Sequence, residues 1–454
     1  MSAMKCLIIA SGEGKRLRTR GDSKPLTPLL GTPLIDRVIL TAKKAGITDF
    51  YIVIGYKAKE VQKHLEKLSR KRDIKITCIL NNEWNKENGI SVLKAKNALK
   101  ENFLLLMSDH IFNEGILKKL LRKKIDSNQI ILAVDYNIKN TLVDTKDATK
   151  VLIKNNKVID IGKNIDKYNA FDTGIFLCTP IIFRAIEEGI QRGDTSLTGG
   201  IKVLAEKRKA KVFDIKSDYW IDVDNEDMFK KAEKHLLSTL KKPSDGVISR
   251  YINRPMSARI TKQLVKTNIT PNIISFLSFI LCCIAASMFL LKGYIYLALG
   301  GILAQLASII DGSDGEVARL KFQETDFGAW FDAVLDRYGD AFLLISLTYH
   351  TMYYLDGKDI PLLFGFLAII GTFMNSYTAD KYDGFMRKKI PLEREYIRLG
   401  RDTRIFIIFL LAIINQPIIA IVLIAVSMNI ENVRRIIILY RREKEEHTTG
   451  GNCG

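Results

Sequence analysis

DGSDGEVARLKFQETDFGAWFDAVLD, residues 311–336, decides the fold of the second half of the chain. Its aspartates lie three residues apart at Asp311 and Asp314 and four apart at Asp332 and Asp336, spacings that place each pair on one face of a helix. Apolar segments flank the stretch, and carboxylates this close to hydrocarbon repel one another unless a divalent cation compensates their charge. A solvated acidic loop would not have helical spacing. We therefore expect two adjacent membrane helices that share a metal site.

The stretch matches the pattern D-x2-D-G-x2-A-R-x8-G-x3-D-x3-D at every fixed position and resembles the CDP-alcohol phosphotransferase family. The resemblance covers about residues 250–440 and implies an all-α domain of six transmembrane helices that forms a homodimer. It implies Mg²⁺ or Mn²⁺ at a CDP diphosphate, bound by Asp311, Asp314 and Asp332. It makes Asp336 the general base for the acceptor hydroxyl and a further metal ligand. The residues implied around the nucleotide are Gly315, Ala318, Arg319 and Gly328.

Six apolar stretches occur after residue 270, and all but the fifth approach the roughly 20 residues that a bilayer core requires. They span residues 272–291, 294–312, 336–355, 360–380, 404–415 and 417–439. Eight basic residues lie in 381–404, and further arginines follow the last stretch. By the positive-inside rule, both termini and both active sites face the cytoplasm. This predicts a multi-pass protein of the cell membrane.

The basic segment 381–404 also supplies candidates for an acceptor phosphate site. We favour Lys381 and Arg401 because both adjoin apolar spans. The other candidates in this segment are Arg387, Lys388, Lys389 and Arg404. Charge that only sets the membrane topology is the alternative explanation.

The net charge of +19 is unevenly divided along the 454 residues. Residues 1–250 contain 47 Lys and Arg against 31 Asp and Glu, whereas residues 251–454 contain 22 against 19. A basic surface on the first part suits anionic substrates. Nucleic acid is a poor partner, because the sequence has neither aromatic stacking patterns nor a folded basic motif. The six cysteines show no CxxC spacing and indicate no zinc or disulfide framework.

Residues 4–240 alternate short β-rich runs with polar or amphipathic segments. The predicted strands are 6–10, 51–54, 74–80, 103–107, 130–134, 151–153, 171–177 and 212–215, and the predicted helices include 34–45 and 226–240. Such alternation is typical of a three-layer, mostly parallel, Rossmann-like α/β domain. We place the domains at 1–242 and 270–442. An amphipathic juxtamembrane helix, 243–269, joins them, and a flexible tail, 443–454, follows.

The sequence SGEGKRL, residues 11–17, follows the first predicted strand. Glycines at such a position let backbone N–H groups approach phosphates, and the basic residues that follow can neutralise a triphosphate. Lys24 lies downstream, Asp109 ends the fourth strand, and Asp222 lies near the domain's end. Two carboxylates at the carboxyl ends of strands in one sheet can converge on Mg²⁺. The alternative is that each aspartate only caps a strand.

These features, in this order, resemble the nucleoside triphosphate transferase family that makes sugar nucleotides and CDP-alcohols. The segments 81–83 (NNE) and 88–91 (NGIS) resemble its phosphocholine and inositol-phosphate cytidylyltransferase branch. The resemblance implies that Lys24 lies at the reacting phosphates and that Asp109 and Asp222 bind Mg²⁺ or Mn²⁺, with Asp224 as an alternative ligand. The residues implied around the nucleotide are Gly12, Gly14, Arg16, Lys24 and Ser91.

A domain that makes a CDP-alcohol, fused to one that consumes it, implies that the first product is the second substrate. The architecture resembles the bifunctional inositol-1-phosphate cytidylyltransferase and di-myo-inositol phosphate phosphate synthase family. The resemblance implies CTP, inositol 1-phosphate and CDP-inositol as ligands, a membrane lipid environment and an osmolyte as product. Two alternatives stay open. One is phospholipid synthesis from a CDP-headgroup or CDP-lipid; the other is a transporter or sensor with a degenerate nucleotide-binding domain.

Overall fold

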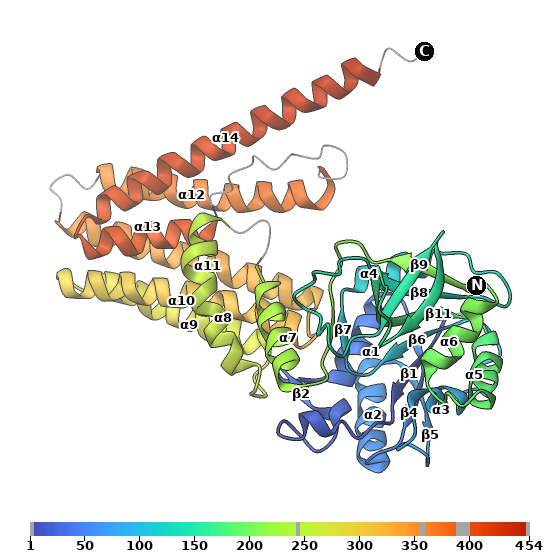
Figure 1. Cartoon of the computed structure of the whole chain (residues 1–454). Helices are drawn as coiled ribbons and strands as arrows, with labels where there is room; N and C mark the ends of the chain where they lie inside the picture. Colours follow the sequence, from blue (N-terminus) through green and yellow to red (C-terminus); the bar gives the residue numbers. More distant parts are fainter. Residues whose placement is uncertain (1–3, 242–245, 355–358, 387–399, 451–454) are drawn as a thin grey trace. The chain divides into compact units, whose positions relative to one another are not determined.

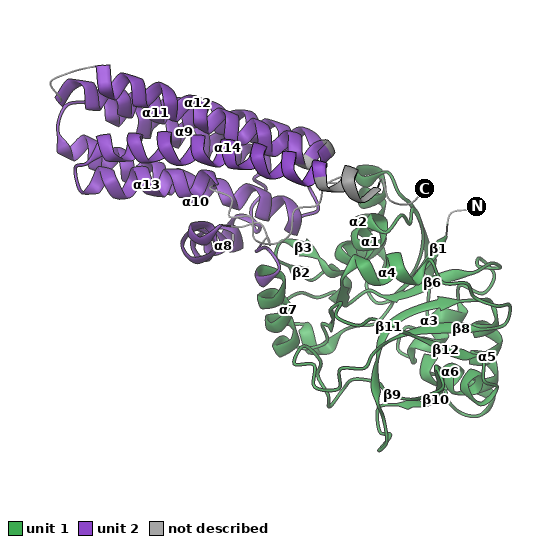
Figure 2. Cartoon of the chain, turned by 90° about the horizontal axis from the view of Figure 1, so that it is seen from above, with its two compact units in different colours: residues 1–237 green, residues 238–454 purple. Residues whose placement is uncertain are grey.

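The computed structural model describes residues 4–241, 246–354, 359–386 and 400–450. It divides into two compact units, Met1–Leu237 and Ser238–Gly454, which Figure 2 shows in different colours. Arg387, Lys388 and Lys389, three candidates for the acceptor phosphate, lie outside the described residues.

A nine-stranded sheet forms the centre of the first unit and contains every strand that the sequence predicted (Figure 1). Its order is β5 (Lys75–Leu80), β4 (Asp49–Ile54), β1 (Lys5–Ala10), β6 (Phe103–Met107), β11 (Ala170–Cys178), β8 (Ile130–Asp135), β12 (Ala210–Asp214), β10 (Lys157–Gly162) and β9 (Lys150–Lys154). Strands β5, β4, β1 and β6 are parallel, but β11 runs antiparallel to both β6 and β8. The expectation of a mostly parallel sheet is borne out by strand direction, since only β10 and β11 run opposite to the other seven strands; the antiparallel pairs that these two strands form make the sheet mixed.

The three-layer prediction is confirmed, because each face of the sheet carries its own helices. Along β1 the side chains alternate: Cys6, Ile8 and Ala10 join one core cluster, and Leu7 and Ile9 join the other. The first cluster is covered by α1 (Leu34–Lys44), α2 (Ala58–Arg72) and α4 (Glu114–Leu120). The second is covered by α3 (Asn88–Leu93), α5 (Ile181–Gln191) and α6 (Leu197–Glu206). Helix α7 (Glu226–Ser238) lies where the sequence predicted the closing helix.

A two-stranded ribbon stands apart from this sheet. Strand β7 (His110–Phe112) pairs antiparallel with β13 (Trp220–Asp222), and Asp222 lies opposite His110. The expectation that Asp109 and Asp222 end strands of one sheet is wrong for Asp222, because β13 belongs to the ribbon. The ribbon brings the two aspartates together, because β7 begins one residue after Asp109.

In the described residues the second unit is all-α, and each of the six predicted apolar stretches corresponds to one of six helices, beyond which it extends by at most two residues. These are α9 (Pro271–Leu290), α10 (Tyr294–Leu320), α11 (Asp326–Tyr354), α12 (Asp359–Lys381), α13 (Arg401–Ile413) and α14 (Pro417–Gly450). Of the described helices, α9, α10, α12 and α14 are long and apolar enough to cross a membrane. Helix α13 has only 13 residues, and charged side chains interrupt the first half of α11. Helix α14 continues to Gly450, through much of the expected tail.

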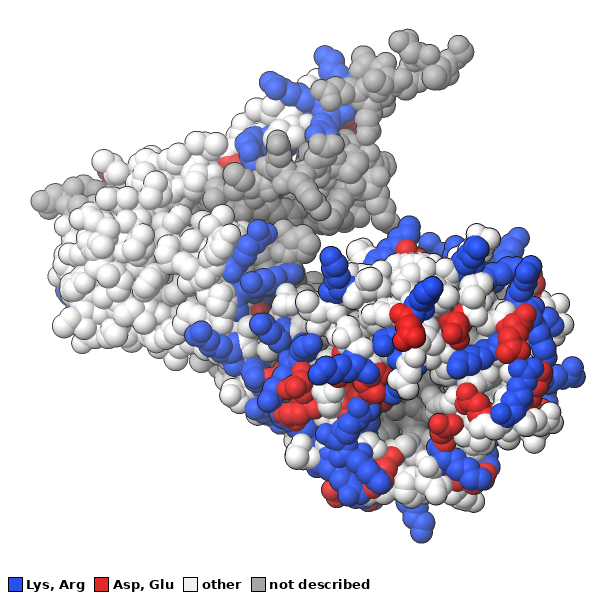
Figure 3. All heavy atoms as spheres, in the orientation of Figure 1, with Lys and Arg blue, Asp and Glu red and all other residues white. Residues whose placement is uncertain are grey.

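The juxtamembrane helix is α8 (Arg254–Leu264), shorter than the segment predicted for it. It packs on α10 with Ser257 and Thr261, both buried, while Met256 is exposed. On the face drawn in Figure 3, charged residues crowd the first unit and are sparse over the helices of the second. That contrast agrees with a membrane environment for the second unit alone.

Candidate functional sites

The glycine loop after β1 shapes one wall of a cavity of about 400 Å³ in the first unit. Gly14 has φ +66°, and a Cβ built on it would overlap the side chain of Lys24. Gly12 faces open space, and both glycines line the cavity. The loop therefore needs glycine at Gly14 so that Lys24 can approach the backbone.

Lys24 is the central cation of this cavity. It lies in a short 3-10 helix, Lys24–Leu26, and its side chain is only 10% exposed. Its Nζ pairs with Asp109 and Asp224, and Asp224 also accepts a hydrogen bond from Arg16 at 2.7 Å. Burial alone would lower the pKa of Lys24, but the two carboxylates outweigh burial and raise it. Lys24 is therefore positively charged at every physiological pH.

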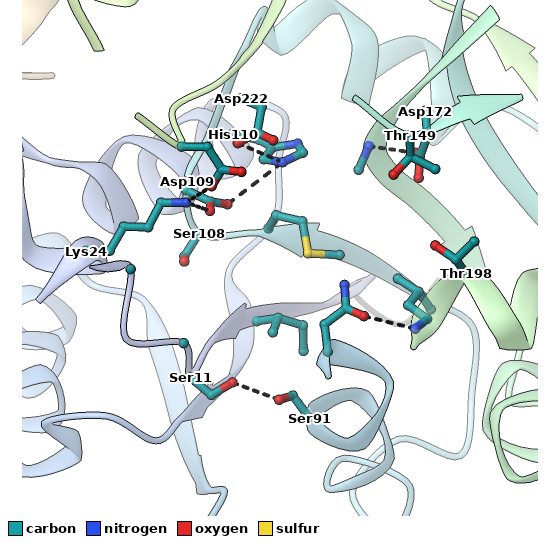
Figure 4. A pocket seen from close by; sticks show the side chains of 18 of the residues that line it. Ser11, Lys24, Ser91, Ser108, Asp109, His110, Thr149, Asp172, Thr198 and Asp222 are labelled. Atoms are coloured by element: carbon teal, nitrogen blue, oxygen red, sulfur yellow. Dashed lines mark hydrogen bonds and ion pairs between the residues drawn. The ribbon is translucent and has the colours of Figure 1, made fainter. Parts of the chain in front are cut away.

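Asp109, His110 and Asp222 form a group suited to a metal ion, with ligand atoms within 4.8 Å of one another (Figure 4). Asp222 Oδ1 is buried and accepts no hydrogen bond in the part of the chain that the structure describes. His110 Nδ1 lies 2.7 Å from Thr173 O, so the ring directs Nε2 toward Asp222 Oδ1, 3.5 Å away. Carboxylate oxygens suit Mg²⁺, and an added imidazole also suits Mn²⁺. The residues present thus fit a divalent cation.

Sequence reasoning identified Asp109 and Asp222 in this group and missed His110. His110 follows Asp109 directly, so its position beside a predicted metal ligand was the one sequence signal that could have identified it. Burial alone would lower the pKa of His110, but Asp222 and Asp109 outweigh it and raise the pKa to about 10. Asp224 pairs with cations and lies outside the group.

Two further missed residues line the same cavity. Lys163 lies 2.6 Å from Asp147 and follows β10, which is not among the predicted strands. Asp172 lies in β11, and burial raises its pKa to about 6. Ser91, which was predicted at the nucleotide, also lines the cavity and hydrogen-bonds to Ser11 at 2.7 Å. Of the predicted nucleotide residues, Gly12, Gly14, Lys24 and Ser91 therefore share one cavity with Asp109 and Asp222. Arg16 is not among the lining residues but donates to Asp224, which is.

The signature aspartates of the second unit converge as the sequence indicates. Asp311 of α10 and Asp332 and Asp336 of α11 present ligand atoms within 4.8 Å of one another. Asp332 Oδ1 is buried and makes no hydrogen bond among the described residues. Asp314 instead accepts hydrogen bonds from Ser275 Oγ and from the N–H of Gly315. The three clustered carboxylates fit a divalent cation, with Asp314 beside them.

Arg401 lies inside this acidic cluster. Its Nη1 is 2.8 Å from Asp311 Oδ2 and 2.7 Å from Asp336 Oδ1, and its Nε is 3.3 Å from Asp340 Oδ1. Asp340 also pairs with Arg404 at 2.6 Å, and both side chains are about 95% buried. The ammonium group of Lys381 lies 5.5 Å from the ring of Tyr377. The structure thus places Arg401 among the aspartates of the cluster. Among the described contacts, none joins Lys381 to Arg401.

The small residues of the signature lie where side chains are tightly packed. A Cβ on Gly328 would come within 3.1 Å of Asn272 Oδ1, and one on Gly315 within 3.3 Å of Arg319 Nη1. Ala318 is buried, and Arg319 donates a hydrogen bond to the carbonyl of Leu240 at 3.4 Å. Larger side chains at the two glycines would push the polar groups of this region apart.

Comparison with known proteins accounts for both units. Residues 5–239 match the nucleotidyl transferase family, and residues 268–430 match the CDP-alcohol phosphatidyltransferase family. An Aquifex aeolicus protein named "Bifunctional IPC transferase and DIPP synthase" is 34% identical over 444 residues, covering 96% of this chain and 98% of that protein. The chain belongs to this bifunctional family.

A family member of the same name from Rubrobacter xylanophilus is 32% identical over 437 residues, covering 96% of each chain. A solved structure, the inositol-1-phosphate CTP transferase from T. maritima, is 27% identical and covers 52% of this chain and 95% of its own, with a TM-score of 0.47. As a member of the IPC transferase and DIPP synthase family, the chain is a transferase with two catalytic units. Its apolar helices and its phosphatidyltransferase unit make it a membrane protein.

Proposed function

We propose that this enzyme makes an inositol phosphodiester in two steps. CTP and inositol 1-phosphate give CDP-inositol and pyrophosphate; CDP-inositol and a second inositol 1-phosphate then give di-myo-inositol phosphate phosphate, an osmolyte, and CMP. One observation carries the proposal: a single chain holds two carboxylate clusters, each with a buried oxygen that no hydrogen bond satisfies among the described residues. Relatives that cover nearly the whole chain are named for both activities.

In the first site, a phosphate oxygen of inositol 1-phosphate attacks the α-phosphorus of CTP. The bond from that phosphorus to the β-phosphate breaks, and pyrophosphate leaves. Lys24 needs no proton transfer to act, because it is already charged and fixed by two carboxylates, so it stabilises the charge that develops on the phosphates. Mg²⁺ or Mn²⁺ bound by Asp109 and Asp222 would supply further neutralisation. The residues that we place around CTP are Gly12, Gly14, Arg16, Lys24 and Ser91.

In the second site, a hydroxyl of the acceptor inositol 1-phosphate attacks the phosphorus that carries inositol in CDP-inositol. Asp336 takes the hydroxyl proton, and the bond to CMP breaks as CMP leaves. Arg401, 2.7 Å from Asp336, supplies positive charge beside the general base and suits the acceptor phosphate. Mg²⁺ or Mn²⁺ would neutralise the diphosphate, held by Asp311, Asp314, Asp332 and Asp336. Gly315, Ala318, Arg319 and Gly328 would surround the nucleotide, and Lys381 is a second candidate for the acceptor phosphate.

We also propose that all six helices α9–α14 span the cell membrane, with both sites on its cytoplasmic side and a homodimer formed through these helices. The eight basic residues in 381–404 support this orientation. The catalytic domains would comprise about residues 1–242 and 270–442, with surrounding membrane lipid as a partner of the second.

The test is product analysis with the purified full chain. Incubation with CTP, Mg²⁺ and a panel of alcohol phosphates should yield a CDP-alcohol and then a phosphodiester only with inositol 1-phosphate, identified by phosphorus NMR. Asp336→Asn should leave CDP-inositol formation intact and lower diester formation at least about 100-fold, the scale of a lost general base.

Asp380→Asn is the matched control, because Asp380 is 71% exposed and pairs with Arg337 at the surface. It should keep both activities. Loss of both activities in Asp336→Asn would contradict the assignment of separate sites, and transfer to a lipid alcohol would contradict the proposed acceptor.

A further inference from the structure

A buried aspartate outside the signature connects two arginines of α13. Asp340 lies on α11, four residues after Asp336, so the two carboxylates share one face of that helix. Its Oδ2 accepts a hydrogen bond from Arg404 Nη2 at 2.6 Å, and its Oδ1 accepts one from Arg401 Nε at 3.3 Å. Asp340 and Arg404 are each 4% exposed. One buried carboxylate therefore fixes two guanidinium groups.

The two arginines differ in their other contacts. Arg404 pairs with no acid except Asp340 among the described residues, and its Nη1 lies 3.9 Å from the sulfur of Met428. A buried charge is costly unless an opposite charge accompanies it. Because Arg404 already neutralises Asp340, the positive charge of Arg401 is available to other anions.

Arg401 has donors left for such an anion. Its Nε faces Asp340, and its Nη1 lies 2.8 Å from Asp311 Oδ2 and 2.7 Å from Asp336 Oδ1. The N–H donors of Nη2 have no acceptor among the described residues. Arg401 is also the first residue of α13, and the preceding Gly400 has no side chain to cap the N–H groups of the first turn. These groups and Nη2 together suit a phosphate.

We propose that Asp340 is a positioning residue for the second reaction, in which it holds Arg401 so that Nη2 faces the phosphate of the acceptor inositol 1-phosphate. This deepens the proposed function, on which it rests. Because Asp340 is 4% exposed, it acts through Arg401 rather than on the substrate. Without this contact, both Nη groups of Arg401 would be free to turn toward Asp311 and Asp336, and the donor for the acceptor would be lost.

Asp340→Asn tests this role in the full-length enzyme supplied with CDP-inositol. The amide keeps an oxygen for Arg404 but loses the charge that holds Arg401 as well. We expect the KM for inositol 1-phosphate in the second reaction to rise at least about tenfold, the scale of a hydrogen bond to a charged group. The KM for CDP-inositol and the rate of the first reaction should not change.

Asp402→Asn is the matched control, because it removes the same charge beside Arg401. Asp402 accepts a hydrogen bond from Ser308 at 3.0 Å and pairs with no arginine among the described residues. It should leave the KM for inositol 1-phosphate unchanged.

Arg401→Lys separates positioning from a general structural effect. Lysine keeps the charge but lacks the planar fork that contacts two anions at once, so the KM for inositol 1-phosphate should rise. Adding Asp340→Asn to Arg401→Lys should raise this KM no further, because both changes act on one contact. Two increases that multiply would overturn the inference, since Asp340 would then act independently of Arg401.

Asp340→Asn/Arg404→Met keeps the test decisive if Asp340→Asn does not fold, as judged by thermal unfolding. It removes both charges of the buried pair and leaves neither unpaired, and it should raise the same KM. A KM within about twofold of the wild type in a folded variant of either kind would overturn the inference. An unchanged KM in Arg401→Lys would instead overturn the proposed acceptor site, and failure of the wild type to form the diester would overturn the proposed function.

Discussion

At the scale of single residues, one glycine arranges two acid–base groups of the first cavity. The pairing of β11 with β8 is irregular between Asp172 and Phe176, and within this interval Gly174 has φ +69°. A Cβ on Gly174 would overlap the ring of His110, and the N–H of Gly174 donates to Asp172 Oδ1 at 2.8 Å. The irregularity thus admits the histidine and holds the aspartate at the cavity wall.

Asp172 should make the stability of the first unit depend on pH. Burial raises its pKa from 3.8 to about 6, so the folded state binds this proton more tightly than the unfolded state. Its contribution to the free energy of unfolding should therefore be largest below pH 4 and decline by about 2–3 kcal/mol as pH rises to 6. Asp172→Asn should remove this decline and stabilise the enzyme at pH 7. The measurement is thermal unfolding of the full chain between pH 4 and pH 8.

Asp126→Asn is the control for this experiment, because Asp126 is 67% exposed and pairs only with Lys211 among the described contacts of its side chain. Its pH profile should match the wild type within about 0.5 kcal/mol. If the stability of Asp172→Asn still declined with pH as in the wild type, a group other than Asp172 would be responsible for the decline.

At the scale of elements, α8 is bound to α10 through a buried acid in the signature itself. Glu316 is 1% exposed, and its carboxylate accepts hydrogen bonds from Ser257 at 2.8 Å and Thr261 at 2.7 Å. Arg254 Nη1 lies 2.9 Å from the same carboxylate and 3.3 Å from the carbonyl of Gly312. Glu316 occupies a variable position of the signature, yet it fixes the helix that carries Asp311.

Glu316→Gln should destabilise the second unit by about 3 kcal/mol, since it removes the buried carboxylate that accepts from Arg254, Ser257 and Thr261 together. Thr261→Val removes one hydrogen bond and should cost about 1 kcal/mol. Thermal unfolding of the full chain in detergent compares the two variants. Equal effects of the two changes would contradict a central role for the carboxylate.

Hydrophobic periodicity predicted most helices and strands. A strand that is buried on both faces is a continuous apolar run, and a helix that is buried along one stripe has apolar residues at helical spacing. It missed β10, although Asn155 and Asn156, which adopt φ +52° and +59°, are a recognisable hairpin signal. It also missed the β7–β13 ribbon, since strands of three residues carry too little pattern. For α8, it predicted an amphipathic helix but not the small polar face that packs on α10.

Local sequence patterns predicted only part of the two sites, for the same reason. Fixed spacing predicted the convergence of Asp311, Asp314, Asp332 and Asp336, because both pairs lie on regular helices; the structure groups all of them except Asp314, which lies beside the group. Spacing could not predict that His110 would face Asp222, which depends on a ribbon formed by segments more than 100 residues apart. Nor could it predict Arg401 among the aspartates, since that contact joins α13 to α10 and α11 through tertiary packing.

At the scale of the whole molecule, each candidate site is built within one unit. The described residues of the first cavity all precede residue 225, and the clustered aspartates and Arg401 all lie beyond residue 310. Among the residues that the structure describes, neither arrangement uses a side chain of the other unit. Each catalytic step should therefore proceed without the other site being active.

A mixture of two inactive variants tests this independence. Asp109→Asn should stop CDP-inositol formation, and Asp336→Asn should stop diester formation. Mixed together with CTP and inositol 1-phosphate, they should form the diester after a lag, because CDP-inositol made by one molecule can diffuse to another. The lag should shorten as the concentration of the Asp336→Asn variant increases.

Each variant alone is the control and should form no diester. Supplying CDP-inositol to Asp109→Asn should restore its second reaction to the wild-type rate. Diester formation that fails in the mixture but returns with supplied CDP-inositol would mean that the intermediate is not released.

The pairing of Arg401 with Asp311, Asp336 and Asp340 also bears on how the protein is made. A helix pair that brings these acids to the edge of the bilayer would insert poorly if no positive charge accompanied them. Here the positive charge is the guanidinium group of Arg401, which belongs to the same polypeptide. It becomes available when α13 is synthesised, after α10 and α11. Biogenesis of the membrane unit would then require completion of the later helices rather than a supply of metal ions.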